Sequence, residues 1–283
     1  MATKFVLLKK LIEFFVLCFG IEFWIKFVNL VPRVSKDLRQ RLVLSPKARE
    51  NSRHLDYLGL VYYSNINDSL NILARVNFDT WESKSRNTFH ELSKTADLIL
   101  DIGAYSGLYS LIGARSSSNA RVIAFEPNPA MRQILQNNVH LNNFNARIQV
   151  EEFALSDRKG LSILSVGKDT STAKLNVVSK IDPELVDAEM TVRVATLDDF
   201  NLVANSMIMK VDIEGSELAF LRGALNTIAT NRPTILMEAL TDTDLESQSK
   251  LLSNLGYERP VCMGIDTGDE RNYLWTATKN PAH

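Results

Sequence analysis

The amino-acid sequence predicts an α/β fold in which a mostly parallel sheet is covered by helices on both faces. From about residue 97 onward, apolar runs of strand length alternate with helical segments. The strands are continuously apolar instead of alternating with polar residues, which is typical of strands buried on both faces. At 283 residues, the chain is long enough for one large domain of this class with additions, or for two small ones.

The elements are expected in a definite order along the chain. Residues 58–66 indicate a short strand pair or edge structure, and residues 79–94 indicate a helix that leads up to the first buried strand. Strands are then expected at 98–103, 121–127, 147–156, 161–166, 190–196, 206–215 and 234–239, and helices at 105–116, 129–142, 216–229 and 244–256. Residues 167–189 form a polar excursion, and residues 257–278 suggest two final strands around a turn.

The composition argues against a nucleic-acid partner. The formal net charge is -1, so no basic excess is available to neutralise a phosphate backbone. Cys18 and Cys262 show neither metal-ligand spacing nor a disulfide framework. This cysteine usage is compatible with a reducing compartment, and we expect a cytoplasmic location.

Residues 1–56 are expected to form a helical extension and connector ahead of the main domain at residues 57–283. Residues 5–32 are apolar but carry charges, and a membrane-spanning helix would bury Glu22 at a cost of roughly 2.5–3.5 kcal/mol. We expect two short amphipathic segments hinged near Gly20. Three uses of residues 1–31 stay open: packing on the main domain or on a subunit of a homo-oligomer, peripheral contact with a membrane, and a true span.

The strand at 98–103 ends in a sequence that predicts a ligand-binding turn. Asp101 stands at the strand end, and Gly103 and Gly107 follow. Small residues let the main chain approach a bound molecule, and the next helix points its N-terminus toward it. The spacing is not G-x-G-x-x-G and no Lys-Ser/Thr follows, which excludes a P-loop and disfavours a dinucleotide oxidoreductase. Glu126 ends the next strand, where an acid can accept hydrogen bonds from both hydroxyls of a ribose.

These residues resemble the S-adenosylmethionine site of class I methyltransferases. The strings DIGAYSG, FEPNP, ALSDRKG, TLDDF, MKVDIEGSE, LRGAL and PTILMEA occur in the order and spacing of the FkbM-type methyltransferase family, over roughly residues 79–277. The resemblance implies a Rossmann-like class I methyltransferase fold with a seven-stranded sheet. It also implies S-adenosylmethionine as cofactor and O-methylation of a hydroxyl on a sugar, glycolipid or natural-product small molecule.

The resemblance further implies roles for individual residues. Those expected at the cofactor are Asp101, Gly103, Ala104 and Gly107 at its methionine part, Glu126 with Pro127 and Asn128 at the ribose, and Phe153 and Ala154 at the adenine. Glu82 matches an acid of the family that would bind the cofactor's amino group, or it is a solvated helix residue. Tyr105 stands in the same turn, where the family more often has Asn.

Two later strands also end in acids. Asp212 closes one strand with Glu214 two residues on, and Glu238 closes the next. These strand ends are neighbours in a doubly wound sheet, so we expect the three carboxylates to converge beside the transferred methyl group. They would act as a general base for a hydroxyl, as ligands of Mg²⁺, or as hydrogen-bond partners of substrate or cofactor. Lys210 would pair with one of these acids or point to solvent.

The polar excursion is the expected source of acceptor contacts. Its residues Ser171, Thr172 and Lys174 are donors that would bind sugar hydroxyls, unless they belong to an ordinary solvated loop. The acceptor is expected to be a hydroxylated small molecule, glycan or glycolipid. The alternative function is a catalytically weak or inactive cofactor-binding platform, attached to a membrane or partner through the N-terminal helices.

Overall fold

The computed structural model describes residues 53–54, 57–62, 82–167, 173–175, 186–265 and 271–278. Most of the expected N-terminal extension lies outside the described residues, as do Ser171 and Thr172. The domain boundary and the contacts expected of residues 1–31 therefore stay predictions. Within the described ranges, no helix combines the length and the apolar character that crossing a membrane requires.

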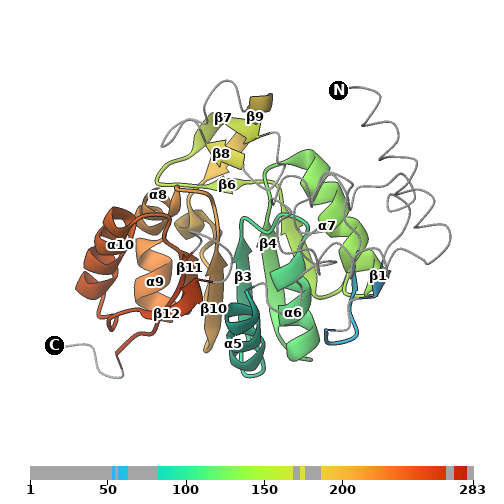
Figure 1. The fold of residues 1–283 in the computed structure, drawn as a ribbon, viewed down its shortest axis with the longest axis horizontal. Coiled ribbons are helices and arrows are strands. Elements are labelled where there is room, and N and C mark those ends of the chain that lie inside the picture. The colour runs from blue at the N-terminus through green and yellow to red at the C-terminus, as the bar shows by residue number, and fades with distance from the viewer. Residues whose placement is uncertain are drawn as a thin grey trace, which may run out of the picture.

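A seven-stranded sheet forms the centre of the described structure, in the order β12-β13-β11-β10-β3-β4-β5 (Figure 1). β10 runs parallel to β3 and β11, and β4 runs parallel to β3 and β5. β13 is antiparallel to both β11 and β12. The mostly parallel seven-stranded sheet is thus confirmed. Its strands are β3 (Leu98–Ile102), β4 (Arg121–Phe125), β5 (Ile148–Glu151), β10 (Met207–Val211), β11 (Thr234–Glu238), β12 (Val261–Ile265) and β13 (Arg271–Trp275).

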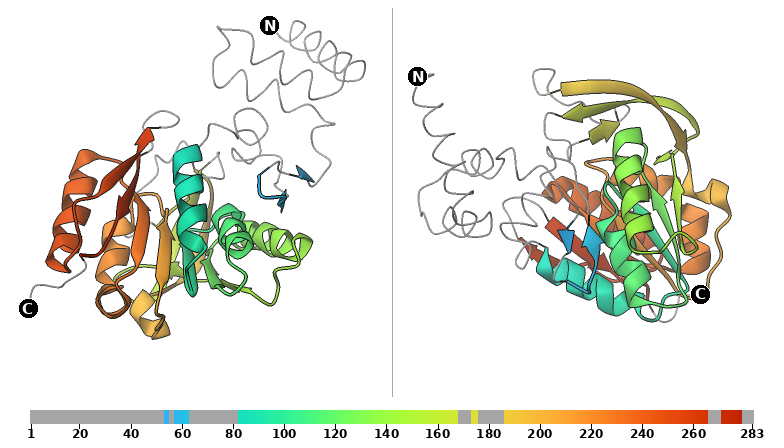
Figure 2. Two further views of the ribbon diagram at one scale, coloured as in Figure 1. Left: turned by 90° about the horizontal axis from the view of Figure 1, so that it is seen from below. Right: turned by 90° about the vertical axis from the view of Figure 1, so that its right-hand side faces the viewer.

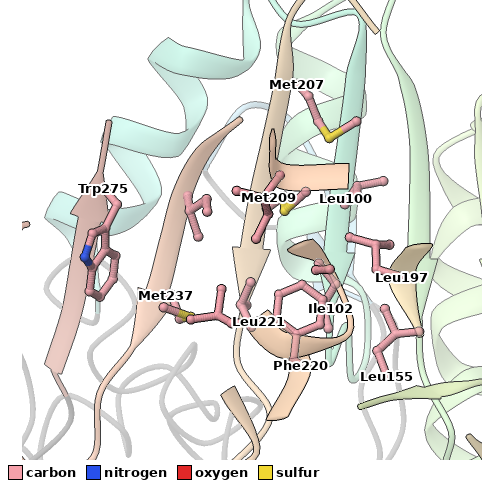
Figure 3. Close-up of a cluster of buried hydrophobic side chains, with 14 of the residues drawn as sticks. Leu100, Ile102, Leu155, Leu197, Met207, Met209, Phe220, Leu221, Met237 and Trp275 are labelled. Atoms are coloured by element: carbon pink, nitrogen blue, oxygen red, sulfur yellow. The ribbon is translucent and has the colours of Figure 1, made fainter. Parts of the chain in front are cut away.

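Helices cover both faces of this sheet because alternate residues of each strand point to opposite sides. Ile99 packs in a cluster with residues of α5 (Ser83–Ser93), α6 (Leu108–Ser116) and α7 (Pro129–Leu141). Its neighbour Leu100 packs on the other face with residues of α8 (Glu217–Arg222), α9 (Leu225–Asn231) and α10 (Asp242–Asn254). Figure 3 shows part of this second cluster, where Phe220 of α8 lies beside Ile102 of β3.

A smaller sheet lies above the carboxyl ends of β3 and β4 (Figures 1 and 2). Its order is β6-β9-β7-β8, and its strands are β6 (Ala154–Leu155), β7 (Gly160–Gly167), β8 (Ala173–Leu175) and β9 (Val186–Ala195). The single strand expected at 147–156 is therefore wrong, because its two ends belong to different sheets. β5 continues the central sheet, whereas β6 pairs with β9. Part of the expected polar excursion is strand as well, since it contains β8 and the start of β9.

The single helix expected at 216–229 is also wrong, because the structure has α8 and α9 with a break at Gly223. A Cβ atom on Gly223 would lie 1.9 Å from the carbonyl oxygen of Ser156, so this segment is packed directly against the chain that follows β6. The contact fixes the position of the break.

A short strand pair precedes the main sheet. β2 (Val61–Tyr62) pairs antiparallel with β1 (Arg53–His54), a segment that the sequence assigned to the charged connector. The amide of Val61 and its carbonyl both bond to the side chain of Asn142, just beyond α7. These bonds attach β2 to the main domain.

Candidate active site

A cavity opens between the carboxyl ends of the central strands and the smaller sheet. It collects residues from the ends of β3, β4 and β10, from the chain between β5 and β6, and from β7 and β8. Its lining residues are Ile102, Gly103, Tyr105, Phe125, Glu126, Pro127, Asn128, Met131, Phe153, Ala154, Leu155, Leu164, Ala173, Leu175, Asp212, Ile213 and Glu214. Acids that are far apart in the sequence therefore share one cavity.

The turn after β3 is held by main-chain contacts on two sides. The amides of Gly103 and Ala104 donate to the carbonyl oxygen of Phe125, at 3.1 and 3.0 Å. Gly103 has a φ of +79°, and a Cβ there would lie 1.9 Å from the carbonyl oxygen of Asp212. Glycine is required here by the close approach of the β10 end, in addition to any approach of a ligand. Tyr105, at a φ of 52°, also adopts a left-handed conformation.

Glu126 connects the turns that follow β3 and β4. One carboxylate oxygen accepts from the amide of Tyr105 at 2.7 Å, and the other accepts from the amide of Asn128 at 2.8 Å. The side chain of Asn128 in turn caps α7 by accepting from the amide of Ala130. Burial raises the pKa of Glu126 to about 7, against the effect of these two backbone bonds. Each carboxylate oxygen has a second lone pair, so Glu126 retains capacity for ligand hydroxyls at the cavity wall.

Asp101 has a different role from the one its position suggested. Its side chain is only 2% exposed and it is not among the residues that line the cavity. One carboxylate oxygen accepts from both the amide and the hydroxyl of Ser110, at 2.8 and 2.6 Å. Ser110 is in the first turn of α6, whose N-cap Gly107 has no side chain to offer. Asp101 therefore caps α6 from the neighbouring strand, while burial raises the pKa of its carboxyl to about 6. A contact between Asp101 and the methionine part of a cofactor stays a prediction.

The chain after β5 and the start of β6 contribute to the apolar wall of the cavity. Phe153 and Ala154 line it together with Met131, Leu164 and Leu175. The Phe153 ring lies edge-on to Phe200, with 5.8 Å between ring centroids. Such a wall suits a flat, largely apolar group such as a purine base.

The structure places the acids that follow β10 and β11 near one another, and their position beside a transferred methyl group stays a prediction. Asp212 and Glu214 line the cavity. Glu238, at the end of β11, is buried beside them, and burial together with the charges of Asp212 and Glu214 raises its pKa. One oxygen of its carboxyl group, Oε2, has no hydrogen-bond partner among the described residues.

A buried lysine pairs with these acids, so the alternative of a solvent-exposed Lys210 is wrong. Lys210 is 1% exposed, and its ammonium donates to Asp212 Oδ2 at 2.9 Å and to Asn272 Oδ1 at 3.1 Å. Sequence reasoning missed Asn272 and Tyr109, which complete the group around it. The lysine in the otherwise apolar run MIMKV was the available signal, because a strand buried on both faces leaves it no exit to solvent.

Glu82 lies in this lysine group and not at the cavity wall. Its buried carboxylate accepts from the hydroxyl of Tyr109 at 2.6 Å, and the solvated alternative is therefore wrong. Burial raises its pKa, and the charge of Lys210 acts in the opposite direction. Its predicted contact with the amino group of a cofactor stays untested.

Lys174, predicted to contact the acceptor, lies among the described residues. It is half-buried on β8 between Ala173 and Leu175, and those two residues, not Lys174, line the cavity. A role of Lys174 at an acceptor stays a prediction.

The acids after β10 and β11 do not suit Mg²⁺. In the described part of the chain, no group of three or more His, Cys, Asp or Glu side chains is arranged for a metal ion. Lys210 already places a cation 2.9 Å from Asp212, and a second cation beside an ammonium group would be repelled.

Comparison with known protein families places the chain in one of them. The family described as "Methyltransferase FkbM domain" matches residues 101–259, more than half of the chain. Methyltransferase sdnD of Sordaria araneosa is 28% identical, over 44% of this chain and 59% of its own length. Hexuronic acid methyltransferase AglP of Haloferax volcanii is 26% identical, over 58% of this chain and 64% of its own length. The chain thus spans about three fifths of these curated relatives.

Among solved structures, methyltransferase FkbM from Methylobacillus flagellatus is similar at 19% identity and a TM-score of 0.48. The similarity covers 74% of this chain and 52% of that one.

Proposed function

Because the chain belongs to the FkbM methyltransferase family, we propose that it transfers the methyl group of S-adenosylmethionine to a hydroxyl oxygen of a sugar, glycolipid or other small molecule. One observation carries the proposal: a single cavity is lined by Glu126 after β4 and by Asp212 and Glu214 after β10. An acid suited to a ribose and acids suited to an alcohol therefore share one space.

The cofactor fits the β3 and β4 side of the cavity. Glu126 would accept from the ribose hydroxyls with the lone pairs that its two backbone bonds leave. Phe153, Ala154 and Met131 would hold the adenine by apolar contact. When bound, S-adenosylmethionine supplies a methyl group on a positively charged sulfur, and the nearby carboxylates favour that charge.

Asp212 is the residue best placed to act as general base. A hydroxyl is a poor nucleophile until a base takes its proton. Lys210 occupies Oδ2 of Asp212, so Oδ1 is the atom we assign to receive the proton of the acceptor hydroxyl. Glu214, at the same wall, would orient the acceptor. Burial and two neighbouring acids favour the neutral form of Glu238, which would donate a hydrogen bond instead of taking a proton.

The acceptor class follows from chemistry and from one relative. AglP, a relative over 58% of this chain, is a hexuronic acid methyltransferase. Hexuronic acids and their glycosides are therefore the first acceptors to test.

The test combines cofactor binding with methyl transfer. The wild-type chain is expected to bind S-adenosylhomocysteine in isothermal titration and to transfer a labelled methyl group to a hydroxylated acceptor. Asp212→Asn is expected to retain cofactor affinity within about threefold and to lose roughly 10²–10⁴-fold in kcat, the usual contribution of a general base. The matched control Asp157→Asn changes an exposed acid that contacts Arg158 at 3.9 Å and the hydroxyl of Ser156 at 3.5 Å, and it should change neither quantity.

Two results would contradict the proposal. Failure of the wild-type chain to bind the cofactor would favour an inactive role for the domain. Full activity of Asp212→Asn would remove Asp212 from the mechanism.

A further inference from the structure

Lys210 is a charged residue buried in the middle of the central sheet, where burial of a charge is energetically unfavourable. It lies on β10, a strand with neighbours on both sides, and its register partners are Asp101 on β3 and Leu236 on β11. The other residues of β10 are apolar and buried. Burying an ammonium group costs several kcal/mol unless partners compensate it, so the structure must supply them.

Three elements supply partners to the ammonium group. Asp212 lies just beyond β10 and accepts at 2.9 Å, and Asn272 of β13 accepts at 3.1 Å. The ring of Tyr109, from α6, faces the ammonium with its centroid 5.2 Å from Nζ. These contacts fix the lysine head between the end of β10 and the first turn of α6.

A second layer holds Tyr109 in turn. Its hydroxyl donates to the buried carboxylate of Glu82 at 2.6 Å. Glu82 precedes α5 with a φ of 43°, a left-handed conformation that is unfavourable for a non-glycine residue. The chain therefore accepts strain at the residue that positions the tyrosine.

The group contains more carboxyl groups than ammonium groups. The titratable side chains that face Lys210 and Asp212 are Glu82, Asp101, Tyr109, Glu217 and Glu238. Burial by itself lowers the pKa of Lys210, but Asp212, Glu82 and Glu238 together raise it above its ordinary value. The ammonium therefore stays charged at any pH at which the enzyme would work.

We infer that Lys210 is a positioning residue: it holds the carboxylate of Asp212 at the cavity wall, and Asn272, Tyr109 and Glu82 hold Lys210. The inference rests on the proposed function, because it assigns a role to Asp212 in methyl transfer. Asp212 is bound on its inner side by the buried ammonium, while its side chain remains 33% exposed toward the cavity. Lys210 itself does not line the cavity, so we expect it to act through Asp212 and not by contact with the cofactor or the acceptor.

A structural role alone would give a different result from a positioning role. Replacing a buried ion pair with an apolar residue of similar size is often neutral for stability, so stability alone does not distinguish them. Lys210→Met is expected to retain S-adenosylhomocysteine affinity and the KM for the acceptor within about threefold. It should lower kcat about 10- to 100-fold and move the acid limb of the kcat–pH profile upward by about one pH unit.

The matched control is Arg147→Met. Arg147 is a partly buried cation just before β5 that donates to the carbonyl oxygens of Ala114 and Ala120, and it does not line the cavity. Its loss removes the same charge and a comparable set of hydrogen bonds, and it should leave the pH profile unchanged. A wild-type kcat and pH profile in Lys210→Met would overturn the inference.

Two further measurements keep the inference testable. If Lys210→Met does not fold, Asn272→Leu removes one lysine partner and leaves the Lys210–Asp212 pair. It should shift the profile in the same direction by a smaller amount, and an unchanged profile would overturn the inference. If the wild-type chain methylates no acceptor, the proposed function fails, and the crystal structure of Lys210→Met decides the inference separately. Rotation of the Asp212 carboxylate away from the cavity supports it, and an unmoved carboxylate overturns it.

Discussion

The carboxyl ends of the central strands form two regions, one at β3 and β4 and one at β10, and these two halves stabilise their acids in different ways. In the half proposed to bind the cofactor, at the ends of β3 and β4, Asp101 and Glu126 accept hydrogen bonds from backbone amides. In the half proposed to bind the acceptor, at the end of β10, Asp212 is bound by the ammonium of a buried lysine. Amides hold a carboxylate without bringing a full charge, whereas the lysine brings a full positive charge.

This difference gives the acids of the two halves different structural and electrostatic roles. Amide-held acids fix the loops around them, since every donor belongs to a turn or to a helix start. Burial then raises their pKa values, to about 6 for Asp101 and about 7 for Glu126, because the partial charges of amides do not offset desolvation. The lysine-held acid instead belongs to a group of carboxylates that share one counter-charge. The cofactor half is thus expected to respond to pH near neutrality.

The largest effect is expected at Gly103, where the two halves are in direct contact. Gly103→Ala places a Cβ 1.9 Å from the carbonyl oxygen of Asp212 in a left-handed backbone. Strain and overpacking should lower the free energy of unfolding by about 2–5 kcal/mol, measured by urea denaturation.

Gly107→Ala is the matched control for this variant. Its φ is +90°, but the added Cβ meets the movable side chain of Leu135 at 3.0 Å instead of a carbonyl. It should cost only about 1–2 kcal/mol. Equal losses in the two variants would show that backbone strain alone matters and that the halves are not in critical contact.

The next test removes an amide-held acid. Asp101→Ala leaves the amide of Ser110 without its acceptor at the start of α6, which should cost about 1–3 kcal/mol of unfolding free energy. Asp101→Asn keeps an oxygen at the same place and should lose less. If the two variants were equally unstable in thermal or urea unfolding, the capping role of Asp101 would be wrong.

The smallest effect is a pH dependence of cofactor affinity. Glu126 is mostly protonated below pH 7 and mostly ionised above it, because its pKa is about 7. The ionised form accepts hydroxyl hydrogen bonds better, so affinity should rise with pH. Between pH 6 and pH 8 the Kd for S-adenosylhomocysteine should fall about tenfold. Isothermal titration of Glu126→Gln should give a nearly constant Kd over the same range. A wild-type Kd that does not change with pH would count against the assignment of Glu126 to the ribose.

Much of this site was predictable from local sequence signals. Continuous apolar strands followed by acids indicated a parallel sheet with polar carboxyl ends, and Glu126, Asp212 and Glu214 do meet at one cavity. The split of residues 147–156 between two sheets was not predictable, because both halves are equally strand-like. The break at Gly223 likewise depends on its contact with Ser156, a residue distant in the sequence.

The order of most strands and helices and the positions of acids at strand ends follow from the amino-acid sequence, because they depend on short-range periodicity and on which residues a buried strand admits. The tertiary structure alone decided how each acid is used. Asp101 turned to cap α6, Glu126 connected two loops, and Lys210 came to face Asp212. A carboxylate takes whichever donor the fold brings within about 3 Å. Tyr105 and Glu126 are 21 positions apart, and Lys210 reaches Asn272, 62 positions away, in addition to Asp212 two positions on.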